Sequence, residues 1–213
     1  MVIYMDILTI ASQKGGAGKS TLAGHLAVEA ERRSAGPVAV VDTDPQGSLS
    51  SWWNERTAET PAFAAVEVGQ LPTHMTAVRR QGINLVIIDT PPALIDTIKA
   101  AIAVADLVLI PVKPSPHDLR AIAVVIEMAE QAGKSFCFVV NGATARSRIA
   151  LEARDALAQH GPVAPEILHQ RIDFATSMID GRTVGELNPQ SRSAQEIASL
   201  WNYVREQLRK EKG

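Results

Sequence analysis

The chain has 213 residues, of which 46% are apolar and 21% are charged, and its formal net charge is −2. This length and composition are ordinary for a globular protein, and we predict that residues 1–213 form a single domain. The near-neutral charge argues neither for nor against a nucleic-acid partner, and any basic patch must be local. The one cysteine, Cys137, excludes an intrachain disulfide and a zinc or iron–sulfur site built on several cysteines, and we expect it to be buried in a strand.

The sequence lacks the pattern of a membrane span or a signal peptide. The most apolar region, Ala93–Val112, is interrupted by Asp96, Lys99 and Asp106, whereas a span needs about 20 largely uncharged apolar residues. The N-terminus does not combine a basic start with a long apolar stretch. We therefore expect a soluble, cytoplasmic protein without a membrane partner.

Short apolar runs alternate with helical patterns along most of the chain. The first run, Ile3–Ala11, leads into a glycine-rich loop, and Ser20–Arg33 then repeats apolar residues at helical spacing until Gly36 and Pro37. Further buried strands are expected, in chain order, at Val38–Val41, Leu85–Ile88, Leu107–Val112 and Phe136–Val140. This alternation predicts an α/β fold of the P-loop NTPase type, with a mostly parallel, twisted sheet flanked by helices on both faces.

A last helix is predicted over about residues 193–210. Ser193 and Glu196 have the spacing of a capping box at its start. Its apolar positions between Ile197 and Leu208 have the spacing of a helix that packs on a sheet, and we expect it to pack on the domain. The helix is also amphipathic with a basic end, so a membrane-surface helix is the alternative.

The glycine-rich loop has the sequence of a phosphate-binding loop, because residues 14–21 read K-G-G-A-G-K-S-T between the first strand and the first helix. Glycines let the backbone turn tightly and aim its N–H groups at phosphate oxygens, and the helix N-terminus adds its dipole. In such a loop Lys19 reaches the β- and γ-phosphates and the Ser20 hydroxyl ligates Mg²⁺. With ATP and Mg²⁺ as cofactors, the predicted nucleotide-binding residues are Lys14, Gly15, Gly16, Ala17, Gly18, Lys19, Ser20 and Thr21.

Lys14 is a second lysine directly before the glycines. It repels Lys19 unless an anion neutralises both charges. Lys14 therefore either reaches the same phosphates or serves the nucleotide of another subunit, and a solvated surface lysine is the plainer alternative.

Three aspartates stand at predicted strand ends. Asp42 and Asp44 follow the second strand two residues apart, and Asp89 follows the third strand in the position of a Mg²⁺ partner. Ligands bind to parallel sheets at the carboxyl ends of the strands. We therefore expect one carboxylate to hold Mg²⁺ or the loop and another to orient the attacking water.

Four motifs together resemble the deviant Walker ATPases of the ParA/MinD group. They read K-G-G-A-G-K-S-T, V-V-D-T-D-P-Q-G-S-L, V-I-I-D-T-P-P and I-P-V-K-P-S-P-H-D-L. The resemblance runs from about Ile7 to Leu200. The short chain, without an N-terminal helix-turn-helix domain, is most similar to small plasmid-type, ParF-like ParA proteins.

This resemblance implies a role for each motif residue. Lys14 corresponds to the signature lysine that crosses a nucleotide-sandwich dimer, and Asp44 to the aspartate that positions the hydrolytic water. Asn141, at the end of its strand, either reads adenine through its amide or is a turn residue before Gly142. The implied catalytic residues are Lys14, Lys19 and Asp44, and the implied metal-site residues are Ser20, Asp42 and Asp89.

The implied function is DNA partition, of a plasmid or a chromosome, by an ATP-dependent homodimer. The ATP-bound dimer binds DNA non-specifically, so it is nucleoid-associated, and hydrolysis to ADP and phosphate releases it. Intrinsic hydrolysis is slow, and a centromere-binding or adaptor protein encoded elsewhere stimulates it. DNA-binding candidates are Arg146, Arg148, Arg171, Arg182, Arg192, Arg205 and Arg209, and a solvated surface charge is the plainer interpretation of any one of them.

Other functions fit parts of the sequence. The same ATPase cycle fits the positioning of a protein cargo, since the partner is encoded elsewhere. A MinD-like, membrane-associated ATPase requires the last helix to bind a membrane. A nitrogenase-type reductase is excluded because it needs paired cysteines, and a metabolic P-loop synthase or small-molecule kinase needs acceptor-substrate residues that we do not identify.

Overall fold

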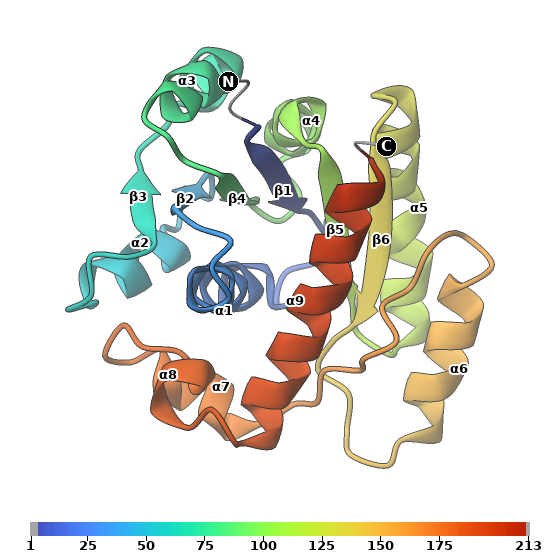
Figure 1. Ribbon diagram of the computed structural model, residues 1–213. Coiled ribbons are helices and arrows are strands. Elements are labelled where there is room, and N and C mark those ends of the chain that lie inside the picture. The colour runs from blue at the N-terminus through green and yellow to red at the C-terminus, as the bar shows by residue number, and fades with distance from the viewer. Residues whose placement is uncertain (1–3, 212–213) are drawn as a thin grey trace.

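The computed structural model describes residues 4–211, and a sheet of six strands runs through the centre of this part of the chain (Figure 1). The strands are β1 (Asp6–Ile10), β2 (Val38–Asp42), β3 (Ala62–Ala64), β4 (Leu85–Asp89), β5 (Leu107–Val112) and β6 (Ser135–Val140). Their spatial order is β3-β2-β4-β1-β5-β6, and every neighbouring pair is parallel. The predicted α/β fold is confirmed, and the sheet is parallel throughout.

Helices cover both faces of this sheet (Figure 1). Helices α1 (Lys19–Arg32) and α9 (Arg192–Lys210) pack on one face, and α3 (Leu71–Arg80), α4 (Ile95–Val104) and α5 (Pro116–Gln131) pack on the other. The remaining helical segments are α2 (Ser48–Asn54), η1 (Val68–Gln70), α6 (Arg148–Leu157), α7 (Ile172–Ser177) and α8 (Val184–Leu187). Since the inner strands are buried on both faces, they read as continuous apolar runs, which is the pattern that predicts parallel strands.

The register of the sheet brings polar strand ends together. Ile10 of β1 is paired with Asp89 of β4, and Asp89 is paired in turn with Asp42 of β2. The chain leaves β1 toward β2 on one side and later passes from β4 to β5 on the other side of β1. The carboxyl end of β1 is therefore the switch point at which sheets of this kind bind ligands.

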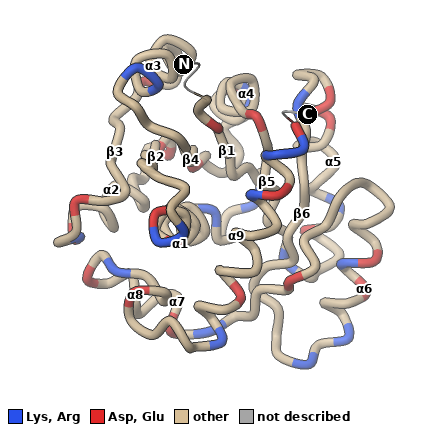
Figure 2. Tube along the Cα trace, viewed as in Figure 1, with Lys and Arg blue, Asp and Glu red and all other residues tan. Residues whose placement is uncertain are grey.

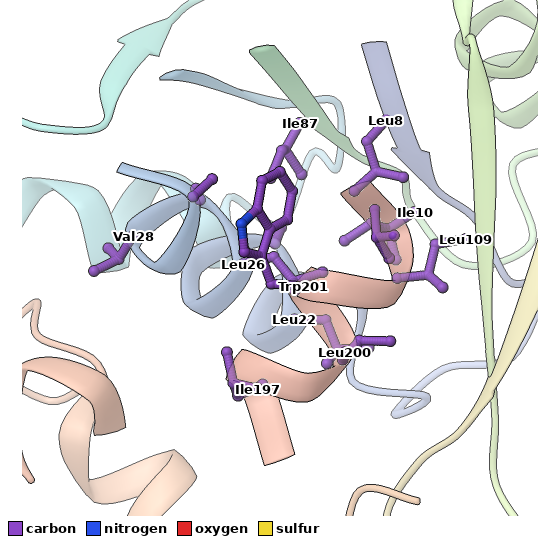
Figure 3. Close-up of a cluster of buried hydrophobic side chains, with 14 of the residues drawn as sticks. Leu8, Ile10, Leu22, Leu26, Val28, Ile87, Leu109, Ile197, Leu200 and Trp201 are labelled. Atoms are coloured by element: carbon purple, nitrogen blue, oxygen red, sulfur yellow. The ribbon is translucent and has the colours of Figure 1, made fainter. Parts of the chain in front are cut away.

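Helix α9 packs on the domain as predicted. Figure 3 shows Ile197, Leu200 and Trp201 of α9 among Leu22 and Leu26 of α1 and apolar side chains of the strands. The apolar face that would bind a membrane is thus covered by the core. Within residues 4–211, no helix combines the length and the apolar character needed to cross a bilayer.

The predicted capping box at the start of α9 is wrong. Ser191 caps the helix, because its Oγ accepts a hydrogen bond from the Ala194 N–H at 3.1 Å. Ser193 therefore lies inside the helix and donates to Asp173 at 2.6 Å, while the Glu196 carboxylate contacts the segment before α7. A capping box does exist in α8, between Thr183 and Glu186.

The strand boundaries differ only slightly from the predicted ones. Ile3, the predicted start of the first strand, lies outside the described residues, and the described part of the strand spans Asp6–Ile10. The sequence misses β3 because a three-residue edge strand is too short to show a pattern. Cys137 is fully buried in β6 as predicted, and this burial raises the pKa of its thiol to about 12.

Trp201 is among the largest fully buried side chains, and its indole N–H finds no acceptor within the described residues. We expect Trp201→Ala to lower the free energy of unfolding by about 3–5 kcal/mol, because it leaves a large cavity between α9 and α1. Trp201→Phe should cost clearly less, since phenylalanine fills most of the space and removes an unpaired donor. Urea unfolding followed by circular dichroism measures both variants, and equal losses would contradict the cavity explanation.

Candidate functional site

The glycine-rich loop between β1 and α1 has a conformation that requires glycine. Gly16 and Gly18 have φ values of 72° and 87°, in the left-handed region, and Gly18 is the N-cap of α1. A Cβ atom on Gly18 would collide with the Asn141 side chain. Asn141 stands at the end of β6 and donates from Nδ2 to the Ala17 carbonyl at 2.7 Å. The end of β6 therefore braces the loop, and the predicted residues from Gly15 to Thr21 lie together in this loop and the first turn of α1.

Lys19 is 6% exposed at the start of α1. Burial lowers the pKa of its ammonium, and the charges of Asp89 and Asp44 partly oppose this effect. Its only hydrogen bond among the described residues is a long one of 3.4 Å to the Lys14 carbonyl. Lys14 is half-buried, donates its N–H to Ser12 Oγ at 3.3 Å, and forms no ion pair within residues 4–211. Both lysines are thus available to an anion.

Asp89, at the end of β4, carries a fully buried carboxylate. Neither of its oxygens has a hydrogen-bond partner within the described part of the chain. Burial, reinforced by the charges of Asp42 and Asp44, raises the pKa of this carboxyl to about 7, although the nearby Ser20 hydroxyl and Lys19 ammonium act in the opposite direction. A buried carboxylate that lacks well-formed hydrogen bonds is costly, which is the condition that a bound cation relieves.

Asp42 and Asp44 have different surroundings from Asp89. Asp42 accepts hydrogen bonds from the Asp44 N–H at 3.0 Å and from the Ser50 N–H and hydroxyl at 2.8 and 2.9 Å. It therefore ties the end of β2 to the first turn of α2. Asp44 is half-buried and accepts from the Gln46 N–H at 2.9 Å, which places its side chain in a local turn beside the loop.

A cavity of about 180 Å³ opens beside the loop. Its lining includes Gly16 and Gly18, Asn141 at the end of β6, Lys113 after β5, and the segment from Leu168 to Arg171. Asn141 thus lines the cavity, while its amide nitrogen holds the loop. The sequence does not identify Lys113 or residues 168–170 as site residues, and it offers Arg171 only as a DNA-binding candidate. Lys113 directly follows a predicted strand, which is a usable signal, whereas residues 168–171 belong to no helix or strand.

Glu196 of α9 holds the wall of this cavity in place. Its carboxylate accepts from the His169 backbone N–H at 3.0 Å, contacts His169 Nδ1 at 2.8 Å and pairs with Arg171 at 2.5 Å. Glu196 is only 6% exposed, so these contacts satisfy a buried charge. The arrangement connects the core helix α9 to the non-regular segment that lines the cavity.

The arginines predicted to bind DNA do not form one free patch. Arg171 is paired with Glu196, Arg182 with Asp180, and Arg148 with Glu152. Figure 2 shows basic and acidic residues interspersed along α6, in and before α8, and at the start of α9. Of these predicted arginines, Arg146, Arg192 and Arg209 are exposed and make no ion pair within the described residues; Arg209 and the half-buried Arg205 lie toward the other end of α9.

Comparison with protein families gives a match to the CobQ/CobB/MinD/ParA nucleotide binding domain over residues 8–184. Maintenance of carboxysome distribution protein A of Halothiobacillus neapolitanus is 30% identical, covering 92% of this chain and 95% of that protein. Its namesake in Gloeobacter kilaueensis is 31% identical, with 96% and 94% covered. The probable plasmid-partitioning protein ParA of Thermus thermophilus is 28% identical, with 91% of this chain but 63% of that protein covered.

Solved structures of low identity share the fold. The septum site-determining protein MinD of Pyrococcus horikoshii, complexed with Mg-ADP, has a TM-score of 0.79 at 19% identity, with 94% of this chain and 96% of that chain covered. A Cyanothece McdA–ATP complex has a TM-score of 0.73 at 19% identity, with 96% of each chain covered. At this identity the similarity is one of fold.

His25 connects the loop helix to α7. Its side chain is buried, with Nδ1 2.8 Å from the Thr21 carbonyl and Nε2 3.4 Å from Ser177 Oγ. Its ring packs edge-on against the Phe174 ring, with 5.3 Å between the ring centroids. Burial lowers the pKa of His25 from 6.5 to about 4. The native state therefore keeps His25 neutral at pH values where the unfolded chain binds a proton.

We expect His25 to make the protein less stable as pH falls from about 6.5 toward 4, because only the unfolded state gains the proton in that window. The loss should be about 2 kcal/mol between pH 7.5 and pH 5. Urea unfolding at both pH values should show this loss as a difference between the wild type and His25→Gln, because Asp89, whose pKa is raised to about 7, acts in the opposite direction in both proteins. An equal pH-dependent loss in the two proteins would contradict the assignment.

Proposed function

We propose that this chain, which belongs to the CobQ/CobB/MinD/ParA nucleotide-binding family, is a dimerising ATPase that positions a large protein assembly in the cell. The observation that carries the ATPase part is a glycine loop with a buried lysine, Lys19, near a buried carboxylate, Asp89, that lacks well-formed hydrogen bonds within the described chain. The cargo part is supported by two relatives that match 92% and 96% of this chain and are named for carboxysome distribution.

The residues at the loop fit Mg²⁺ and a nucleotide. Ser20 and Asp89 offer a hydroxyl and a carboxylate, and residues 4–211 contain no group of three or more His, Cys, Asp or Glu that could hold a metal alone. Magnesium usually binds through one or two protein oxygens together with phosphates and water. The nucleotide, when bound, supplies the γ-phosphoryl group that is transferred to water.

In this proposal each residue at the site has a separate role. Lys19 and the loop N–H groups bind phosphate oxygens, and Ser20 with Asp89 holds the metal. Asp44 orients the attacking water, for which its half-buried place beside the loop is suited. Asp42 is assigned a supporting part, because its oxygens already hold the Asp44 segment and α2.

Lys14 gives ATP its control over assembly in this proposal. Its ammonium forms no ion pair within the described residues, so it is free to neutralise the phosphates of a second subunit's nucleotide. The ATP-bound dimer then binds DNA non-specifically, and the DNA serves as the track for positioning the cargo. An adaptor on the cargo, encoded elsewhere, stimulates hydrolysis and releases the dimer, so that the protein is nucleoid-associated only while ATP is bound.

DNA partition is the second candidate function. It is supported by the match of 91% of this chain to the probable plasmid-partitioning protein ParA of Thermus thermophilus, although this chain covers only 63% of that protein. A membrane-associated function has less support, because the apolar face of α9 is buried against α1 and the sheet.

We expect Lys14→Ala to retain ATP binding and to lose ATP-dependent dimers, with hydrolysis reduced at least about 10-fold. The reason is that a second subunit's phosphates lose a charge-assisted contact worth about 1.5–3 kcal/mol. Light scattering with ATP and with ADP measures the mass, and Lys99→Ala, an exposed lysine on α4, is the matched control. Normal dimerisation by Lys14→Ala would remove the case for a lysine acting in trans.

We expect DNA binding to depend on ATP and on the unpaired arginines. In gel shifts with ATP, ADP or no nucleotide, only ATP should give a complex, which Asp44→Ala should prolong. Arg146→Ala combined with Arg192→Ala should weaken that complex about 10-fold or more, because each dimer loses four phosphate contacts. Arg148→Ala should matter less, since Glu152 already pairs with it. Equal binding in all three nucleotide states would contradict the proposed cycle.

A deletion in the host separates the two candidate functions. Electron cryotomography should show that large protein assemblies lose their even spacing in cells without this chain, while plasmid and chromosome loss rates stay at the wild-type level. Raised loss rates with normally spaced assemblies would instead support DNA partition.

A further inference from the structure

Lys113 is the first residue after β5 and lies beside the phosphate loop, at a place in the site that neither Lys14 nor Lys19 occupies. Its aliphatic stem passes over Gly142, where a Cβ atom would lie 3.6 Å from Cε and 3.8 Å from Cγ of the lysine. Its tip reaches the loop, where a Cβ atom on Gly16 would lie 3.7 Å from Nζ. The two glycines thus leave room for the lysine to extend along the rim of the cavity.

The backbone of Lys113 is held on both sides. The Asn141 N–H donates to the Val112 carbonyl at 2.9 Å, and the Ser115 N–H donates to the Lys113 carbonyl at 2.7 Å. Ser115 also caps α5 by accepting from the Asp118 N–H at 3.1 Å. The ammonium is therefore presented from a rigid strand end, and only the side chain itself is free to adjust.

The charge of Lys113 is not neutralised within the described residues. The side chain is exposed and makes no ion pair there, and none of the described residues lining the cavity is Asp or Glu. Two other residues of the lining, His169 and Arg171, are already held by Glu196. Among the described residues that line the cavity, Lys113 is thus the cation that no carboxylate pairs with, so it is available to bind an anion.

We infer that Lys113 binds the phosphate chain of the nucleotide from the cavity side, at the phosphate nearest the ribose. This rests on the proposed ATP-binding function. The lining of the cavity includes Gly16, Gly18 and Asn141 but neither Ser20 nor Asp89, where the metal and the terminal phosphate are assigned. In this assignment the γ-phosphate lies at Ser20 and the rest of the nucleotide extends into this cavity, so the α-phosphate is the phosphate nearest to Lys113. ATP and ADP share that phosphate, and Lys113 therefore stabilises both states equally.

Isothermal titration with Mg-ATP and with Mg-ADP tests this assignment. Lys113→Gln should weaken both nucleotides by the same factor of about 10, the size expected for one lost charge-assisted hydrogen bond. Lys113→Arg should stay within about threefold of the wild type, because it keeps the charge. Lys99→Gln, which removes an exposed lysine from α4, should leave both affinities unchanged. Thermal unfolding without nucleotide should be the same for all four proteins.

Several outcomes would overturn the assignment. If Lys113→Gln binds ATP and ADP as the wild type does, Lys113 makes no phosphate contact. If it loses ATP affinity alone, the lysine contacts the γ-phosphate and its placement beside the ribose is wrong. A wild-type chain that binds neither nucleotide would instead overturn the proposed function itself.

Discussion

Two opposite charges are buried side by side at the carboxyl edge of the sheet, and neither is well satisfied by the protein. The Lys19 ammonium has a single long hydrogen bond, and the Asp89 carboxylate has none within the described residues. Burial shifts both pKa values toward the neutral forms, lowering that of Lys19 and raising that of Asp89 to about 7. Buried charges of this kind are costly unless they are paired and hydrogen-bonded. An anion for the lysine and a cation for the aspartate relieve that cost together, which is what a magnesium nucleotide provides.

The rest of the fold keeps these charges in place and shapes the space beside them. The parallel register sets Asp89 level with the end of β1, and Asn141 braces the loop from β6. On the other side of the cavity, Glu196 anchors residues 168–171 to α9, and His25 joins α1 to α7. Helices α1 and α9, far apart in the sequence, thus help to define one site, because both pack on the same sheet face through the Trp201 cluster (Figure 3).

The sequence predicts the sheet and the loop well for a physical reason. Strands buried on both faces must be continuously apolar, and a loop with left-handed residues such as Gly16 and Gly18 must contain glycine there. Local rules are less reliable where tertiary contacts compete with them. Ser193 and Glu196 have the spacing of a capping box, yet Ser193 hydrogen-bonds to Asp173 and Glu196 contacts His169. Ser191 is the residue that caps α9. The sequence around residues 168–171 has no pattern that predicts their place in the cavity lining. Their position is held by the Glu196 carboxylate of α9, a helix distant in the sequence.

The ion pairs of the arginines give a physical reason why ATP-controlled DNA binding would require a dimer. Arg148, Arg171 and Arg182 are each paired with a carboxylate, so few of the candidate DNA-binding arginines of a monomer are free of an ion pair. Binding to DNA through phosphate contacts rises steeply with the number of contacts made at once. A monomer with few unpaired arginines, such as Arg146 and Arg192, would bind DNA weakly, and two copies held together would bind far more tightly. In the proposed cycle, ATP controls DNA binding by doubling the number of free charges rather than by creating a new surface.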